Sequence, residues 1–284
     1  MYEELFIKLE EAGNIRNLTQ GSITCYKNCI TIFLNFIQKE PETLTCNDVR
    51  TFLLAKKAEG LKAKTSNLYN TAIHFLFKYV LCIPWDDALV PRMLIDRKLP
   101  VVLERNEVNL ILDVTTNLKH KAMIAVMYSA GLRVSEVCLL HYKDISRKNM
   151  QIHVRKSKNR QDRYSILSKR CLDILTEYWF KCGRPTDILF PSDTTGSYIT
   201  TNSFRNVVVS SAEKAGITRR ITPHCLRHSF ATHLLEQGAD IRLIQALLGH
   251  RNPNSTEIYL HVSNKSLMNI QSPFDLSDQE ELHG

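Results

Sequence analysis

The chain has 284 residues, a net charge of +8 and a pI of about 9.0, and 44% of its residues are hydrophobic. This length suits two domains of ordinary size, and the apolar content excludes a disordered chain. The N-terminal stretch MYEELFIKLEEAG carries acidic residues where a secretory signal would be basic, and the longest apolar run, around residues 122–132, is too short to cross a bilayer. We therefore expect a cytoplasmic protein with no membrane partner.

The eight cysteines form no CxxC pair. Cys25 and Cys29 are four residues apart, as on one helix face, but no matching His or Cys pair lies near them in the sequence. This pattern predicts eight reduced thiols, no metal site and no cofactor.

Residues 1–90 predict a helical domain, because apolar residues recur there at helical spacing. The clearest stripe runs from Ile23 to Ile37, and Thr45 or Asn47 is placed to cap a second helix that ends near Gly60.

A third apolar stripe, residues 68–79, follows the polar stretch KAKTSN at residues 62–67. Helix N-termini with nearby lysines bind phosphate readily, although an ordinary capped loop is equally compatible with these residues. Lys62, Lys64 and Thr65 are the candidates for such a contact.

Residues 91–100 predict a basic linker, because Pro91 and Pro100 bound it and Arg92, Arg97 and Lys98 lie within it. A second domain is expected over residues 101–284. It begins with helices, and Gly131 is a natural helix C-cap. Its expected helices cover 104–118, 121–130, 134–140, 169–181, 201–215 and 223–237, with one more opened by Asp240, and residues 151–154 and 163–167 are expected to form two strands joined by a polar turn.

The basic residues are concentrated within this second domain. Residues 143–170 hold ten Lys or Arg against two Asp, whereas the tail after Gln271 is acidic. A concentrated basic segment in a basic chain favours a polyanion partner, most simply nucleic acid, and a solvated basic face is the plainer alternative.

The stretch TPHCLRHSFATHLL, residues 222–235, predicts a helix capped by Thr222 with Pro223 at its first position. His224 and Arg227 then lie on one face of its first turns. Two such residues at a helix N-terminus suit a bound anion, although a capping His and an Arg paired with a carboxylate are the more ordinary explanation.

Five further residues could serve the same chemistry. Arg133 opens a helix within GLRVSE, and Glu136 one turn later is placed to orient an arginine. Lys158 lies in the predicted hairpin turn. His250 and Tyr259 flank a polar turn, and a tyrosine can act as a nucleophile when nearby cations favour its ionised form.

The order and spacing of these motifs resemble the tyrosine recombinases, the phage-integrase and Xer group, over nearly the whole chain. The segment TPHCLRHSFATHLLEQGADIRLIQALLGHRNPNSTEIYLHVS carries the resemblance, preceded by GLRVSE. The resemblance implies a mainly α fold with two domains: a helical SAM-like core-binding domain, and a mostly helical, mixed α/β catalytic domain with a small antiparallel sheet.

Carried over by position, the resemblance implies that Tyr259 attacks a DNA phosphate and forms a 3′-phosphotyrosyl bond. Arg133 and Arg227 would hold the non-bridging oxygens. His250 would hold the same phosphate, His224 would assist proton transfer, and Glu136 would support the site from outside it.

The family lysine lies on the hairpin and protonates the leaving oxygen. Its pattern, roughly Gly-Lys-Gly-x-Lys-x-Arg, aligns without a gap onto Ser157–Arg163, with Ser157 and Asn159 in place of the glycines and Gln161 in place of the second lysine. This alignment assigns the role to Lys158, with Lys156 as the alternative. The remaining residues expected to contact DNA are Lys62, Lys64, Thr65, Arg155, Lys156, Arg160 and Arg163.

The partner implied is double-stranded DNA with short inverted-repeat core sites. Four copies of the chain would assemble on this DNA, and the resemblance allows accessory proteins in the complex. The reaction implied is site-specific recombination without metal or ATP. A type IB topoisomerase-like activity is the alternative enzyme, and a DNA-binding protein without activity is the alternative outside catalysis.

Overall fold

The computed structural model describes residues 2–96, 99–155 and 162–249. The chain divides into two compact units, Met1–Arg97 and Lys98–Gly284, each with its own hydrophobic core. No described helix has the length and apolar character needed to span a membrane. All eight cysteines lie within the described residues, and all are free thiols, as predicted.

The first unit is helical, as the apolar stripes predict. Of the two candidate caps, Thr45 and Asn47, it is Thr45 that caps α3. Its side chain and that of Asp48 form a reciprocal capping box at the start of this helix. The core lies between the helices and includes Phe33, Phe52 and Ile73, all fully buried. The elements are α1 (Glu3–Ile15), α2 (Gln20–Ile37), a 3-10 turn η1 (Pro41–Thr43), α3 (Cys46–Ala58), α4 (Ala63–Leu76) and a π-helical turn η2 (Phe77–Leu81).

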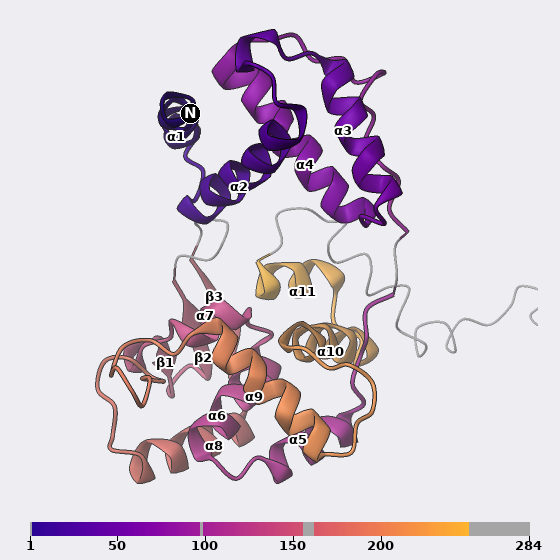
Figure 1. Ribbon diagram of the computed structural model, residues 1–284. Helices are drawn as coiled ribbons and strands as arrows, with labels where there is room; N and C mark the ends of the chain where they lie inside the picture. Colours follow the sequence, from indigo (N-terminus) through magenta and orange to yellow (C-terminus); the bar gives the residue numbers. More distant parts are fainter. Residues whose placement is uncertain (1, 97–98, 156–161, 250–284) are drawn as a thin grey trace, which may run out of the picture. The chain divides into compact units, whose positions relative to one another are not determined.

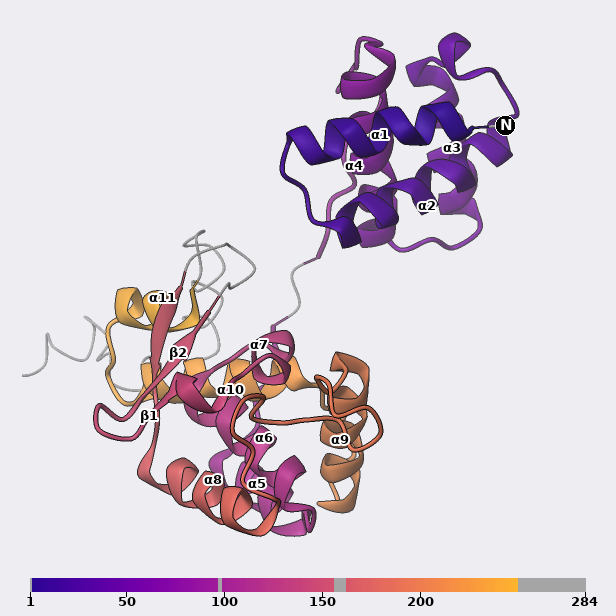
Figure 2. The same cartoon turned by 90° about the vertical axis from the view of Figure 1, so that its left-hand side faces the viewer.

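The second unit is mostly helical with one small sheet, as predicted. Its helices are α5 (Arg105–Val114), α6 (Leu118–Ala130), α7 (Val134–Cys138), α8 (Lys169–Lys181), α9 (Thr201–Lys214), α10 (Pro223–Glu236) and α11 (Ile241–Leu248), with a 3-10 turn η3 (Tyr142–Asp144). Helix α6 lies among α5, α8, α9 and α10 in both views (Figure 1, Figure 2). Its middle part, residues 122–127, is buried on all sides, which explains the unbroken apolar run AMIAVM there.

The sheet contains β1 (Ile145–Ser146), β2 (Gln151–Val154) and β3 (Arg163–Ile166), all antiparallel and in chain order. The two longer strands were predicted, whereas β1 is too short to leave a pattern in the sequence. In the register of β2 and β3, Val154 pairs with Arg163 and Ile152 with Ser165. This register places Arg163 on the sheet face that carries the buried Ile152 and Val154.

The prediction for helices 104–118 and 121–130 was wrong at their junction. Helix α5 ends at Val114, and α6 already begins at Leu118 because the Asn117 side chain accepts a hydrogen bond from the His120 backbone N–H. The predicted C-cap is confirmed: Gly131 ends α6 in the left-handed conformation, with φ of 61°.

The Gly131 turn leaves no room for a side chain. A Cβ at this position would lie 2.3 Å from Cδ1 of Phe230 and 3.0 Å from Cδ2 of Leu248. We expect Gly131→Ala to lower the free energy of unfolding by more than about 3 kcal/mol, since left-handed strain and overpacking add together. Chemical denaturation measures this loss.

Gly216→Ala is the matched control, because Gly216 also has a positive φ but open space around its missing Cβ. This variant should lose only the conformational term of about 1–2 kcal/mol. Equal losses in the two variants would show that the packing against Phe230 contributes nothing.

Candidate active site

Arg133 and Glu136 are fixed by the tight turn between α6 and α7. Arg133 occupies the N-cap position of α7, and its backbone N–H donates to Oε2 of Glu136 at 2.8 Å. Its guanidinium Nη1 donates to Oε1 of the same carboxylate at 2.7 Å. The predicted contact between these two residues is therefore present, and it aligns the guanidinium with the start of the helix.

Arg227 reaches the same place from α10, which begins as predicted with Thr222 at its N-cap and Pro223 at its first position. Its Nη1 donates to the Gly131 carbonyl at 2.6 Å, and its Nη2 donates to the Leu248 carbonyl at 2.7 Å. The same Nη1 lies 3.8 Å from Oε2 of Glu136. The side chain is only 4% exposed, so its charge lies inside the protein.

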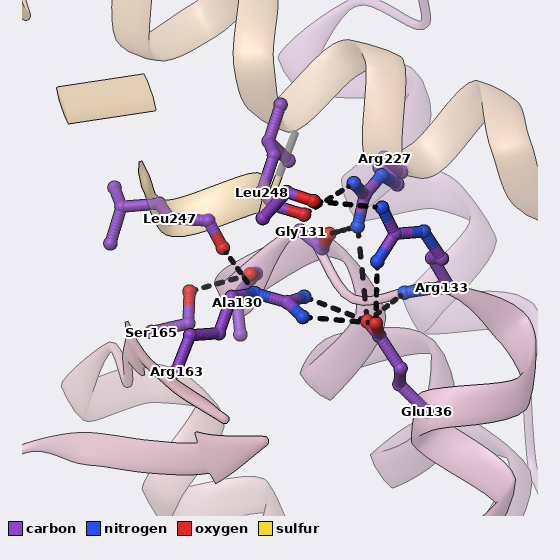
Figure 3. A network of polar contacts seen from close by, with 10 residues as sticks. Ala130, Gly131, Arg133, Glu136, Arg163, Ser165, Arg227, Leu247 and Leu248 are labelled. Atoms are coloured by element: carbon purple, nitrogen blue, oxygen red, sulfur yellow. Dashed lines mark hydrogen bonds and ion pairs between the residues drawn. The ribbon is translucent and has the colours of Figure 1, made fainter. Parts of the chain in front are cut away.

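Arg163 completes the set from β3. Its Nη1 and Nη2 donate to the two oxygens of Glu136 at 2.9 and 2.7 Å, a bidentate contact. Its Nε donates to the Leu247 carbonyl at 2.7 Å. Figure 3 shows the three arginines converging on the single carboxylate of Glu136.

The three arginines also hold the C-terminal end of α11. The carbonyls of Leu247, Leu248 and Gly249 accept hydrogen bonds from Arg163, Arg227 and Arg133 respectively. The last carbonyls of a helix lack partners within the helix and form the negative end of its dipole, so cations suit this position. The arrangement fixes Gly249, the residue that directly precedes His250.

The charges of this cluster do not cancel. Burial raises the pKa of Glu136, but the hydrogen bonds and charge of Arg163, followed by the backbone N–H and charge of Arg133, outweigh burial and lower the pKa to about 2. The carboxylate is therefore ionised at neutral pH. Among the residues that the structure describes, three guanidinium groups against this one carboxylate leave two surplus positive charges in a mostly buried site, which favours a bound anion.

Two histidines lie beside Arg227 on α10. His224 is exposed in the first turn, and His228 follows one turn later, with 6.4 Å between the ring centroids. Burial, with smaller contributions from His224 and Arg227, lowers the pKa of His228 to about 4, so this ring is neutral at pH 7. Sequence reasoning missed His228, although its i, i+4 spacing from His224 was a usable signal.

The other predicted site residues divide into three groups. Lys62, Lys64 and Thr65 are exposed at the N-terminus of α4, in the first unit. Arg155 is exposed and forms an ion pair with the buried Asp144. The predicted Lys156, Lys158, Arg160, His250 and Tyr259 lie outside the described residues.

Arg163 was expected to contact DNA, and its surroundings do not fit that role. Its side chain is 9% exposed, and its Nε, Nη1 and Nη2 donate to acceptors inside the protein. The reason is its position on β3 opposite Val154, which turns the side chain toward Glu136.

Within the described parts of the chain, no three His, Cys, Asp or Glu side chains gather in a way that could hold a metal ion.

Comparisons with known proteins match both units. The family model described as phage integrase family matches residues 101–266, and the model described as phage integrase, N-terminal SAM-like domain matches residues 5–87. A Sinorhizobium fredii protein described as an integrase/recombinase is 35% identical over 271 residues, which cover 95% of this chain and 88% of that protein. Tyrosine recombinase XerD of Oceanobacillus iheyensis is 30% identical over 290 residues, 95% of each chain.

Among solved structures, the XerH site-specific recombinase bound to a palindromic difH substrate has a TM-score of 0.74 at 24% identity, over 91% of this chain and 82% of that chain. This likeness shows a common fold.

The low pKa of Glu136 predicts how stability depends on pH. Its folded-state pKa of about 2 lies below its ordinary value of 4.5, so its ion pairs stabilise the fold above about pH 4.5 and are lost as the pH falls toward 2. We expect Glu136→Gln to lower the free energy of unfolding at pH 7 by about 3 kcal/mol and to remove this component of acid sensitivity.

Denaturant unfolding between pH 2 and pH 7 measures both effects. Glu213→Gln, an exposed carboxylate on α9, is the control and should keep the wild-type profile. If Glu136→Gln also keeps that profile, its carboxylate does not hold the arginines as described.

Proposed function

This chain belongs to the phage integrase family, the tyrosine recombinases, and we propose that it cuts and rejoins DNA at specific sites through a 3′-phosphotyrosyl intermediate on Tyr259. In the first step the Tyr259 oxygen bonds to the scissile phosphorus, and the bond from phosphorus to the 5′ oxygen breaks. The energy of the phosphodiester is kept in the phosphotyrosine. The 5′-hydroxyl of another strand then reverses the step, so no ATP is needed to reseal.

The observation that carries this proposal is the excess positive charge around Glu136. Arg133 and Arg227 would donate to the non-bridging oxygens of the scissile phosphate, where charge develops in the transition state. In many phosphoryl-transfer enzymes, Mg²⁺ neutralises the negative charge that develops on these oxygens. Here two guanidinium groups, aligned by a buried carboxylate before the substrate arrives, are suited to do so.

The remaining roles are proton transfer and a further contact with the phosphate. Lys158 would protonate the leaving 5′ oxygen, and His224, exposed in the first turn of α10 three residues before Arg227, would assist proton transfer near the nucleophile. His250, directly after Gly249, would hold the phosphate together with the arginines.

The partner we propose is double-stranded DNA with short inverted-repeat core sites. Residues 1–90 would form the core-binding domain, 91–100 a basic linker and 101–284 the catalytic domain, so that exposed residues of both domains contribute phosphate contacts. A solved structure described as a lambda integrase tetramer bound to a Holliday junction has the same fold. Exchange of two strands between two sites requires four catalytic subunits, and we propose the same number here. The proposed phosphate contacts on described residues are Lys62, Lys64, Thr65 and Arg155, with Lys156 and Arg160 on the segment between β2 and β3.

A nicked suicide substrate that carries the recombination site tests the mechanism. Release of the short fragment at the nick traps the covalent intermediate, so wild-type protein should form a protein–DNA adduct on a denaturing gel in the presence of EDTA. Tyr259→Phe lacks the attacking oxygen and should form none. Cleavage that requires Mg²⁺, or that survives this substitution, would contradict the proposal.

The choice between Lys158 and Lys156 has its own test. Lys158→Ala should slow cleavage at least about 100-fold, the usual size of general acid catalysis. A 5′-phosphorothiolate leaving group needs no proton and should restore the rate. Lys156→Ala is the matched control. If its defect is the one that the phosphorothiolate rescues, Lys156 is the general acid.

A further inference from the structure

Arg163 differs from the other two arginines of the cluster in how its donors are used. Both ends of its guanidinium fork bind the two oxygens of Glu136, and its Nε binds the Leu247 carbonyl. Gly249 packs directly against it, since a Cβ at Gly249 would lie 3.0 Å from Cδ and 3.2 Å from Nη1 of Arg163. The guanidinium is thus enclosed by the protein.

Arg163 also joins three elements that are distant in the sequence. It belongs to β3, it binds Glu136 on α7, and it binds the last turn of α11. Its own strand is anchored nearby, because the Ser165 hydroxyl donates to the Ala130 carbonyl at the end of α6 at 2.7 Å. The side chain therefore connects a fixed strand to the carboxylate and to the helix end that precedes His250.

The position of Glu136 determines how much charge the other arginines keep for a substrate. Oε1 of Glu136 accepts from both Arg133 and Arg163, whereas Arg227 is 3.8 Å from Oε2. Without Arg163, the carboxylate would lose its bidentate partner and be shared between Arg133 and Arg227 alone. The surplus charge of the cluster would fall from two to one, and both remaining arginines would be drawn toward Glu136.

We propose that Arg163 is a positioning residue for strand cleavage: it holds Glu136 and the end of α11, so that Arg133 and Arg227 keep their positive charge for the scissile phosphate. Arg163 itself does not touch DNA. This inference rests on the proposed function, because it assumes that Arg133 and Arg227 bind the phosphate.

The substitutions that test this are Arg163→Gln and Arg163→Lys. Lysine keeps the charge but cannot make a bidentate contact, so it should rescue little. Lys64→Gln, which removes an exposed predicted phosphate contact, is the control. All variants are compared by circular dichroism first and assayed at a temperature at which they are folded.

The first readout separates a positioning residue from a DNA contact. At saturating protein, Arg163→Gln should form the covalent adduct about 100-fold more slowly, the scale expected for misplaced catalytic groups, while its Kd and the salt dependence of Kd stay near wild type. Lys64→Gln should instead weaken binding, reduce the salt slope by about 0.9 and cleave at a normal rate once bound. A reduced salt slope in Arg163→Gln would overturn the proposal.

The second readout separates positioning from general damage to the fold. A methylphosphonate at the scissile position removes one negative charge from the phosphate. Cleavage of this substrate therefore depends less on the surplus positive charge that Arg163 preserves. The gap between wild type and Arg163→Gln should shrink from about 100-fold to less than about 10-fold on this substrate. An equal gap on both substrates would overturn the proposal. If wild-type protein forms no adduct at all, the proposed function fails, independently of Arg163.

Discussion

The second unit depends on the ion pairs that the buried carboxylate of Glu136 forms with three arginines. An ionised carboxylate that is 5% exposed is stable only when it is paired and hydrogen-bonded, and here the pairing comes from α7, β3 and α10. These contacts explain several local features together. The Gly131 turn brings Arg133 to the start of α7, the Gly131 carbonyl accepts from Arg227, and the end of α11 lies against all three guanidinium groups.

This arrangement also answers a chemical requirement of the proposed reaction. Arginines that must meet a phosphate need to be oriented before it arrives, yet a full set of acidic partners would neutralise them. One carboxylate shared among three arginines orients the guanidinium groups and leaves surplus positive charge. The carbonyls of Leu247, Leu248 and Gly249 add orientation without adding a full negative charge.

Much of the fold follows from local sequence, because helix caps and apolar periods are local signals. Thr222, Asp240 and Gly131 were placed correctly, Thr45 was one of two candidate caps, and β2 and β3 were predicted. The role of Arg163 was not predictable from its setting in a basic run, because its direction depends on the pairing of β3 with β2. The contacts of Glu136 with Arg163 and Arg227 were equally hidden, since these two arginines come from elements far along the chain. Strand β1, with two residues, is defined only by its pairing with β2.

The most direct test of this account is a crystal structure of the Tyr259→Phe variant on its DNA core site. We expect Nη atoms of Arg133 and Arg227 to lie about 2.7–2.9 Å from the non-bridging oxygens of the scissile phosphate. Arg163 should keep both hydrogen bonds to Glu136. A phosphate bound away from Arg133 and Arg227, or an Arg163 that has left Glu136 to contact DNA, would contradict it.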